Sequence, residues 1–65
     1  MLELEQAQLR ERFQTLLAQE QQALLTYEAL LAHAIDPELR MQVELLCRDK
    51  LRHVELTERL LEIVD

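Results

Sequence analysis

Glu20, Lys50 and His53 are the residues of this chain whose types and spacing could support chemistry. Each occupies a position that the surrounding heptad pattern otherwise gives to apolar side chains. A carboxylate together with an imidazole suits zinc, iron or manganese, whereas a lysine ammonium can neutralise the carboxylate instead. Buried charged groups in a short chain must satisfy one another, bind a ligand or destabilise the fold. Their role therefore depends on the elements that position them.

The composition is that of long helices. The 65 residues include no Gly and one Pro, and Leu, Glu, Gln, Ala and Arg dominate. The one strong break is 35–38, where Asp36 can cap a helix and Pro37 suits its first turn. The chain therefore reads as a single domain, 1–65, with helices at about 2–34 and about 37–64. A connection this short makes an antiparallel two-helix hairpin.

Both helices carry a heptad seam with alternating steps of four and three. The positions are Leu9, Phe13, Leu16, Glu20, Ala23, Tyr27, Leu30 and Ala34 in the first helix, and Leu39, Val43, Leu46, Lys50, His53, Thr57, Leu60 and Val64 in the second. Further apolar rows beside each seam include Leu17, Leu24 and Leu31, and Val54 and Leu61. One hairpin cannot cover so much apolar surface, so we expect two hairpins to form an all-α four-helix bundle.

The register of the hairpin predicts which polar residues meet. Facing residues of an antiparallel pair have a constant sum, and a turn at Asp36 and Pro37 puts that sum near 73. Glu20 then faces His53, and Lys50 lies one turn away opposite the small Ala23. Tyr27 lies one heptad beyond Glu20, and its hydroxyl is expected to reach that carboxylate or a water molecule. The sequence thus predicts a polar layer between apolar layers.

A carboxylate facing a histidine inside a helical bundle resembles the half-site of the ferritin-like di-iron proteins, of the rubrerythrin or bacterioferritin kind. The resemblance covers about two thirds of the chain and is carried by 20–27, 36–39 and 50–56. It places Glu20 at the family's first-helix ligand, Tyr27 at a common aromatic position and His53 at the family's histidine. Encapsulated ferritins, two-helix relatives within this family, rebuild the bundle by dimerising, so the resemblance implies the same here.

Lys50 departs from that family, which has a second glutamate at this position. Two chains would then supply two carboxylates and two ammonium groups, and placing a divalent ion beside a cation about 4 Å away costs about 4 kcal/mol at an effective dielectric near 20. We therefore expect a metal-free polar layer that fixes register, with no cofactor and no catalytic residues. The alternative is a metal-binding protein, ferroxidase-like, in which Glu20 and His53 from two chains hold iron, manganese or zinc, with Asp49 as a further ligand.

The charge and the cysteine content restrict the classes of binding partner and the cellular compartment that we expect. The net charge of −6 argues against nucleic acid and anionic membrane as partners. The lone Cys47 and an amino-terminal stretch without a signal-peptide pattern are typical of a cytoplasmic protein. His33 falls in the last turn of the first helix, where a solvent-facing side chain favours the helix dipole. The expected partner is a second copy of the chain, and the sequence identifies no other protein.

Overall fold

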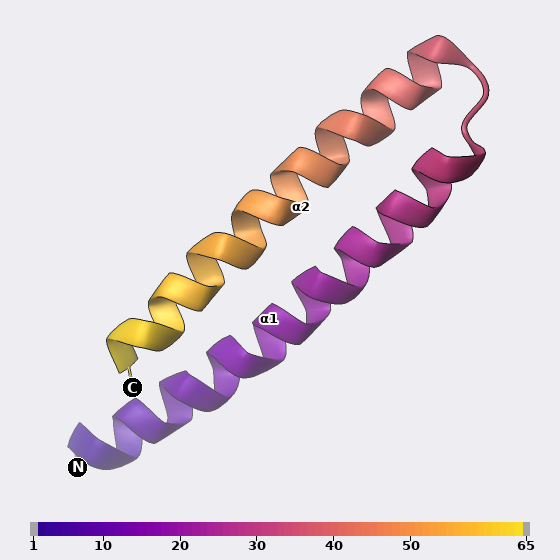
Figure 1. Ribbon diagram of the computed structural model, residues 1–65. Helices are drawn as coiled ribbons and strands as arrows, with labels where there is room; N and C mark the ends of the chain where they lie inside the picture. Colours follow the sequence, from indigo (N-terminus) through magenta and orange to yellow (C-terminus); the bar gives the residue numbers. More distant parts are fainter. Residues whose placement is uncertain (1, 65) are drawn as a thin grey trace.

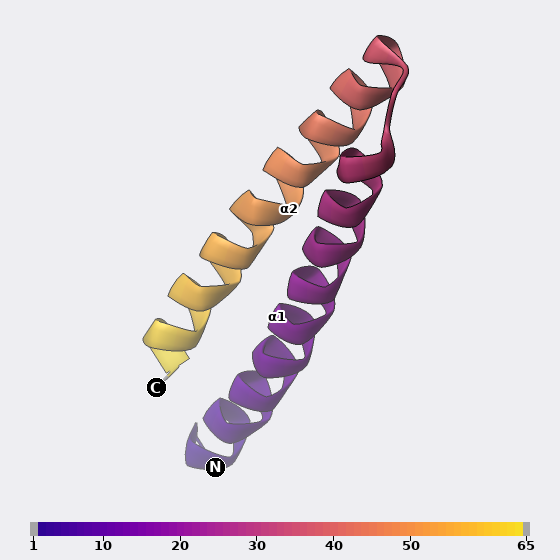
Figure 2. The same ribbon diagram turned by 45° about the vertical axis from the view of Figure 1, so that its right-hand side comes forward.

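Two long helices joined by a short turn make up the computed structural model, which describes residues 2–64. Helix α1 spans Leu2–His33 and helix α2 spans Pro37–Val64. They run antiparallel and side by side, so the start of α1 and the end of α2 lie at the same end of the molecule (Figure 1, Figure 2). The hairpin measures 53 × 14 × 11 Å. The predicted all-α hairpin is confirmed.

The turn between the helices is fixed by Asp36. Its Oδ2 accepts a hydrogen bond of 2.9 Å from the backbone N–H of Leu39, which is one of the donors left without a partner at a helix start. The backbone carbonyl of Asp36 accepts the first bond of α2, from the N–H of Arg40, at 2.9 Å. Pro37 takes the first helical position, where no N–H is needed. The cap predicted from the sequence is therefore present.

Asp36→Ala is expected to lower the free energy of unfolding by about 1 kcal/mol, because it removes the cap of α2. Urea unfolding followed by circular dichroism at a fixed protein concentration measures the change. Asp36→Asn keeps a side-chain oxygen at the same place and serves as the matched control. Equal losses in both variants would contradict a capping role.

The carboxyl-terminal end of each helix is closed by side chains from the other helix. The guanidinium of Arg40 donates to the carbonyl of Leu31 at 3.1 Å, near the end of α1. At the opposite end, the amide of Gln6 and the guanidinium of Arg10 donate to the carbonyl of Val64, at 2.7 and 3.2 Å. The last carbonyls of a helix have no partner within it, so these bonds satisfy acceptors that would otherwise need water. They also tie α1 and α2 together at both ends.

The buried core of the hairpin is small. Among the described residues it comprises Val43, Val54 and Val64, together with one polar residue, Thr57. Thr57 satisfies its hydroxyl by donating to the carbonyl of His53, one turn earlier, at 2.8 Å. A core of this size is marginal for independent folding, because a short chain cannot remove enough apolar surface from water.

The row of residues that packs inside the hairpin differs from the predicted seam. The interior row consists of Gln6, Arg10, Phe13, Leu17, Glu20, Leu24, Tyr27 and Leu31 on α1, of Ala34 directly after α1, and of Val43, Cys47, Lys50, Val54, Thr57, Leu61 and Val64 on α2. The prediction was wrong for the members of the seam that stay exposed, namely Leu9, Leu16, Leu30, Leu39, Leu46 and Leu60. Two helices that pair alone bury only one narrow apolar stripe on each helix. The predicted seam and the row beside it both contain such a stripe, and the hairpin buries the row beside the seam.

Candidate functional site

The carboxylate of Glu20 lies midway along the hairpin against two side chains of α2. Its Oε2 is 3.3 Å from the Nζ of Lys50 and 3.4 Å from the Nδ1 of His53. Glu20 and Lys50 belong to the interior rows, with side chains 17% and 25% exposed, whereas the His53 side chain is 44% exposed. The constant sum predicted Glu20 opposite His53 with Lys50 one turn away, and the structure brings both α2 side chains to the same oxygen of Glu20. We call Glu20, Lys50 and His53 the polar layer.

Hydrogen bonding in the polar layer is incomplete. Oε2 of Glu20 is buried, yet among residues 2–64 no donor reaches it with hydrogen-bond geometry, although two nitrogen atoms lie at ion-pair distance. A buried acceptor without a hydrogen bond is costly, and a carboxylate can accept several. Ion-pair contacts with Lys50 and His53 therefore hold this oxygen, and the His53 side chain extends from the layer to the surface of the hairpin.

Asp49 and Tyr27, the other predicted members of the site, do not join Glu20 within one chain. Asp49 is exposed, and its Oδ1 lies 3.6 Å from an Nη atom of Arg52, one turn along α2. Tyr27 is half-buried in the interior row, and within the described part of the chain its hydroxyl makes no hydrogen bond to Glu20. Two helical turns, about 10 Å, separate these residues along α1, which is too far for the expected contact. His33 is exposed, as predicted.

The polar layer of one chain does not fit a metal ion. In the described segment no three His, Cys, Asp or Glu side chains come close enough together to hold one. The third group at the layer is the Lys50 ammonium, and it lies against the same Glu20 oxygen that would have to bind the ion. Metal ligands must be unprotonated and a nearby cation opposes a divalent ion, so a single hairpin supplies an incomplete and electrostatically unsuitable site.

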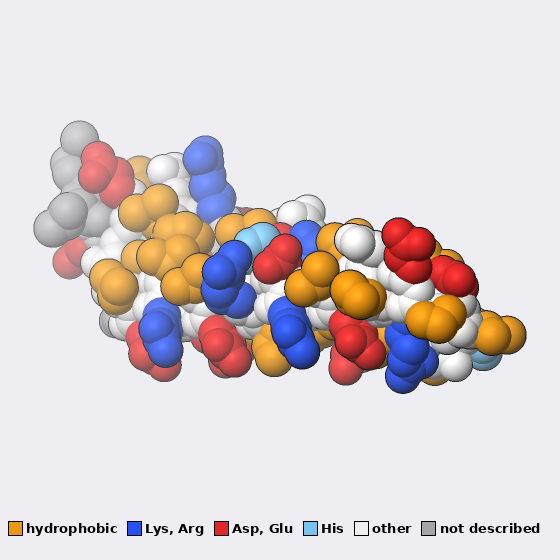
Figure 3. Space-filling model, turned by 90° about the horizontal axis from the view of Figure 1, so that it is seen from above, with side chains coloured by type: hydrophobic (Ala, Val, Ile, Leu, Met, Phe, Trp, Pro, Cys, Tyr) orange, Lys and Arg blue, Asp and Glu red, His pale blue; other side chains and the backbone are white. Residues whose placement is uncertain are grey.

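Six exposed leucines form an apolar surface on one side of the hairpin. Five of the six come directly before a residue of the interior row, and the sixth, Leu39, lies seven residues before Leu46, which is one of the five. In an antiparallel helix pair, residues at such positions line the same side. We call them the leucine face: Leu9, Leu16, Leu30, Leu39, Leu46 and Leu60. His53 belongs to the same seven-residue series as the members on α2. Figure 3 shows one side of the hairpin, on which hydrophobic side chains alternate with charged ones and a histidine lies among charged side chains near the middle.

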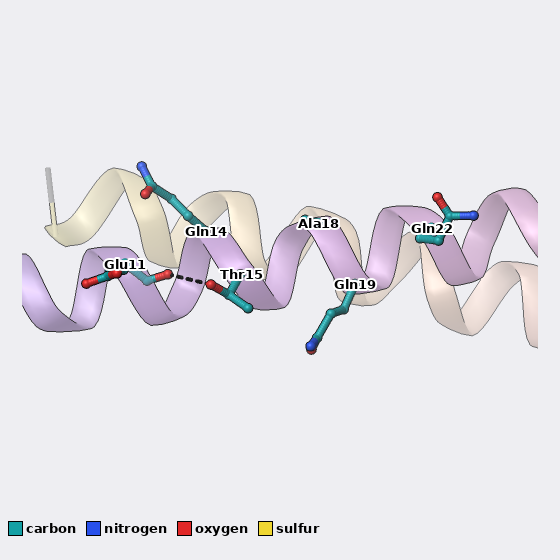
Figure 4. A pocket seen from close by; sticks show the side chains of 6 residues that line it. All are labelled: Glu11, Gln14, Thr15, Ala18, Gln19 and Gln22. Carbon is teal, nitrogen blue, oxygen red and sulfur yellow. Dashed lines mark hydrogen bonds between the residues drawn. The ribbon is translucent and has the colours of Figure 1, made fainter.

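A shallow hollow on α1 offers no convergent chemistry. It is lined by Glu11, Gln14, Thr15, Ala18, Gln19 and Gln22, all from one helix. In Figure 4 the Gln14 and Gln19 side chains point in different directions, and the only bond drawn is from the Thr15 hydroxyl to the Glu11 carbonyl, 3.1 Å long. Catalytic pockets gather a few polar groups around an enclosed space. This hollow has neither property.

Neither the character of the helices nor a comparison with known proteins indicates a function for this chain. Neither α1 nor α2, within residues 2–64, combines the length and apolar character that a bilayer crossing demands. No protein-family model matches the chain, and no curated protein or solved structure is significantly similar to it. The fold and the site therefore define a class, an antiparallel helical hairpin with a half-buried polar layer, and any function has to be argued from its contacts.

Proposed function

We propose that the chain is a self-associating structural module, two copies of which pair through their leucine faces into a ferritin-like four-helix bundle with a metal-free polar layer. The leucine face carries this proposal. Its six side chains are between 39% and 55% exposed, and they follow a heptad spacing on both helices. Scattered exposed leucines need no explanation, but apolar rows with heptad spacing along two adjacent helices, interrupted on α2 by His53, are typical of a surface that another helix pair covers.

The exposed area of the hairpin supports the same proposal. A compact monomer of 7.7 kDa would expose about 4,300 Å², whereas this hairpin exposes 5335 Å². Its radius of gyration is 15.3 Å, against about 11 Å for a compact chain of this length. The excess of about 1,000 Å² is close to the area that each partner buries in a stable interface, about 800 Å². A second copy is an occupant of suitable size.

The polar layer supplies specificity in this proposal. Polar and charged groups inside a helical bundle reduce stability relative to apolar packing, but a misaligned partner would leave them unsatisfied. Glu20, Lys50 and His53 lie near the middle of both helices. A second copy shifted by one heptad would therefore set a charged group against leucine.

The melting temperature is expected to rise with protein concentration, because dimerisation stabilises the folded chain by mass action. Thermal unfolding followed by circular dichroism between about 2 and 200 µM checks this, and the expected increase is at least about 5 °C. Asp36→Ala serves as the control, since it lowers stability at every concentration without touching the leucine face. A melting temperature that does not change over this range would remove the support for self-association.

A second candidate function is metal binding at the dimer interface, with ferroxidase-like activity as its extended form. The 3.4 Å approach of Glu20 to His53 favours it, because two chains would bring two carboxylates and two imidazoles to one level. Metal analysis of protein purified without chelators separates the candidates. The metal-free proposal predicts less than about 0.1 metal ion per chain. Stoichiometric iron, manganese or zinc that is lost in His53→Ala would establish the second candidate instead.

A further inference from the structure

We propose that the second copy packs with its turn at the same end as the first, so that α1 of each copy lies on α2 of the other and each Glu20 meets the partner's Lys50 and His53. This inference rests on the proposed self-association but departs from the ferritin-like order of helices, in which one long crossover joins the two helix pairs and their turns therefore lie at opposite ends. The two-fold axis then runs along the length of the bundle. Each Glu20, which already lies 3.3 Å from the ammonium of Lys50 in its own chain, then has an opposite charge on the partner side of the layer as well.

Two symmetric arrangements can cover the leucine face, and they differ at the polar layer. With the turns at the same end, α1 stacks on the partner's α2, and the four central charges alternate in sign around the bundle. With the turns at opposite ends, α1 stacks on α1 and α2 on α2. Glu20 then faces Glu20 of the partner subunit, and Lys50 faces Lys50 of the partner subunit. Opposite charges attract and like charges repel most strongly in a partly desolvated layer, so the first arrangement is favoured.

The position of the polar layer supports the alternating arrangement. A two-fold axis along the bundle keeps each residue at the level of its own copy, so the two layers coincide without any adjustment of register. His53, 44% exposed, lies in the leucine-face series beside the buried Oε2 of Glu20. This axis brings the partner's His53 to the Glu20 side of the layer, where an imidazole lies beside a carboxylate instead of beside a second imidazole.

The other charges do not oppose this choice. Six acidic and three basic residues lie in 2–19 and 54–64, at the end that carries the chain termini. Five acidic and three basic residues lie in 21–49 and 51–52, toward the turn. Asp65 adds one acidic residue at the carboxyl terminus, so the two ends differ by two units of formal side-chain charge. Salt screens these exposed side chains more strongly than the half-buried layer. The polar layer therefore decides the arrangement.

A spin-label distance tests the arrangement directly. Cys47→Ala removes the only thiol, and Ile35→Cys adds one in the turn, where the native side chain is 94% exposed and makes no packing contribution. Double electron–electron resonance on the labelled dimer is expected to give a distance below about 30 Å, since helices pack 8–10 Å apart. If the turns lay at opposite ends, the two labels would be about 45 Å apart, because each lies 15 residues of helical rise from Glu20, on opposite sides of the polar layer. That distance would overturn the proposed arrangement but not the self-association. A monomer, with no dipolar signal, would overturn the proposed function as well.

A charge exchange provides an independent test. Glu20→Lys combined with Lys50→Glu keeps the attraction within one chain and the overall composition, but reverses the pattern across the interface. Refolding this variant with an equal amount of ¹⁵N-labelled wild type, followed by native mass spectrometry, gives the hybrid fraction. The proposed arrangement predicts hybrids well below the statistical half, since α1 and the partner's α2 would then carry like charges. A hybrid fraction of half or more would overturn it.

Discussion

Leu46→Glu is expected to raise the dissociation constant of the dimer at least about 100-fold. Leu46 belongs to the leucine face and is 40% exposed in the single hairpin, so the proposed interface buries it. Each dimer carries the substitution twice, and each glutamate would lose its water without gaining a partner. A 100-fold change corresponds to about 2.7 kcal/mol, which is ordinary for a central interface residue. Sedimentation velocity over a dilution series measures the dissociation constant.

Leu25→Glu is the matched control for that experiment. Leu25 is 61% exposed on α1. It follows an interior residue by one position instead of preceding one, so it lies on the other side of the hairpin from the leucine face. The same change of leucine to glutamate should leave dimerisation within about threefold of wild type. If Leu25→Glu were as damaging as Leu46→Glu, or if both were harmless, the leucine face would not be the interface.

Lys50→Glu is expected to lower the free energy of unfolding by about 2–3 kcal/mol, and a divalent metal should then recover most of that loss. The substitution replaces an ammonium 3.3 Å from Oε2 of Glu20 by a second carboxylate. Two like charges about 4 Å apart repel by about 4 kcal/mol at an effective dielectric near 20, and the partial exposure of the site reduces that cost. Thermal unfolding with and without Mn²⁺ or Zn²⁺ measures both effects.

Lys50→Gln separates loss of the ammonium from gain of a carboxylate. It removes the attraction to Glu20 without adding a like charge, so we expect a loss of about 1 kcal/mol and no response to metal. A metal response in Lys50→Glu alone would identify Lys50 as the residue that keeps the layer metal-free. If metal failed to stabilise Lys50→Glu, the account of the lysine as the occupant of a metal position would be wrong.

The two helices and their turn could be predicted because local signals define them. Asp36 and Pro37 combine a cap with a residue that suits a first helical turn, and the rest of the chain contains no other helix breaker. Helix α1 ends at His33, one residue before the predicted boundary, which is within the usual fraying of helix ends. These features depend on neighbouring residues alone.

The interior row could not be predicted, because adjacent apolar residues make periodicity ambiguous. Leu16 and Leu17, or Leu60 and Leu61, satisfy the same heptad from either side. Which of the two is buried depends on how many helices pack together, and the single hairpin takes Leu17 and Leu61. The predicted seam contains instead the leucines that remain exposed, which is the pattern expected if a second helix pair covers them.

The polar layer could be predicted although the seam was wrong, because two of its residues belong to both the predicted seam and the observed interior row. Glu20 and Lys50 lie in the predicted seam and also in the interior row. The predicted register put Lys50 one turn from the level of Glu20, and its long side chain spans that turn to reach the carboxylate. The bonds from Gln6 and Arg10 to the end of α2 gave no such signal. Backbone carbonyls at a helix end are present in every sequence, so residue types alone do not reveal which side chain reaches them.

Sedimentation equilibrium of the unmodified chain, with a reducing agent to exclude a Cys47 disulfide, tests the central claim most directly. The proposed four-helix bundle predicts a mass near twice 7.7 kDa at tens of micromolar, with dissociation on dilution accompanied by loss of helical circular dichroism. A folded, fully helical species at the mass of one chain over the same range would contradict it, because the leucine face would then be stable in water without a partner.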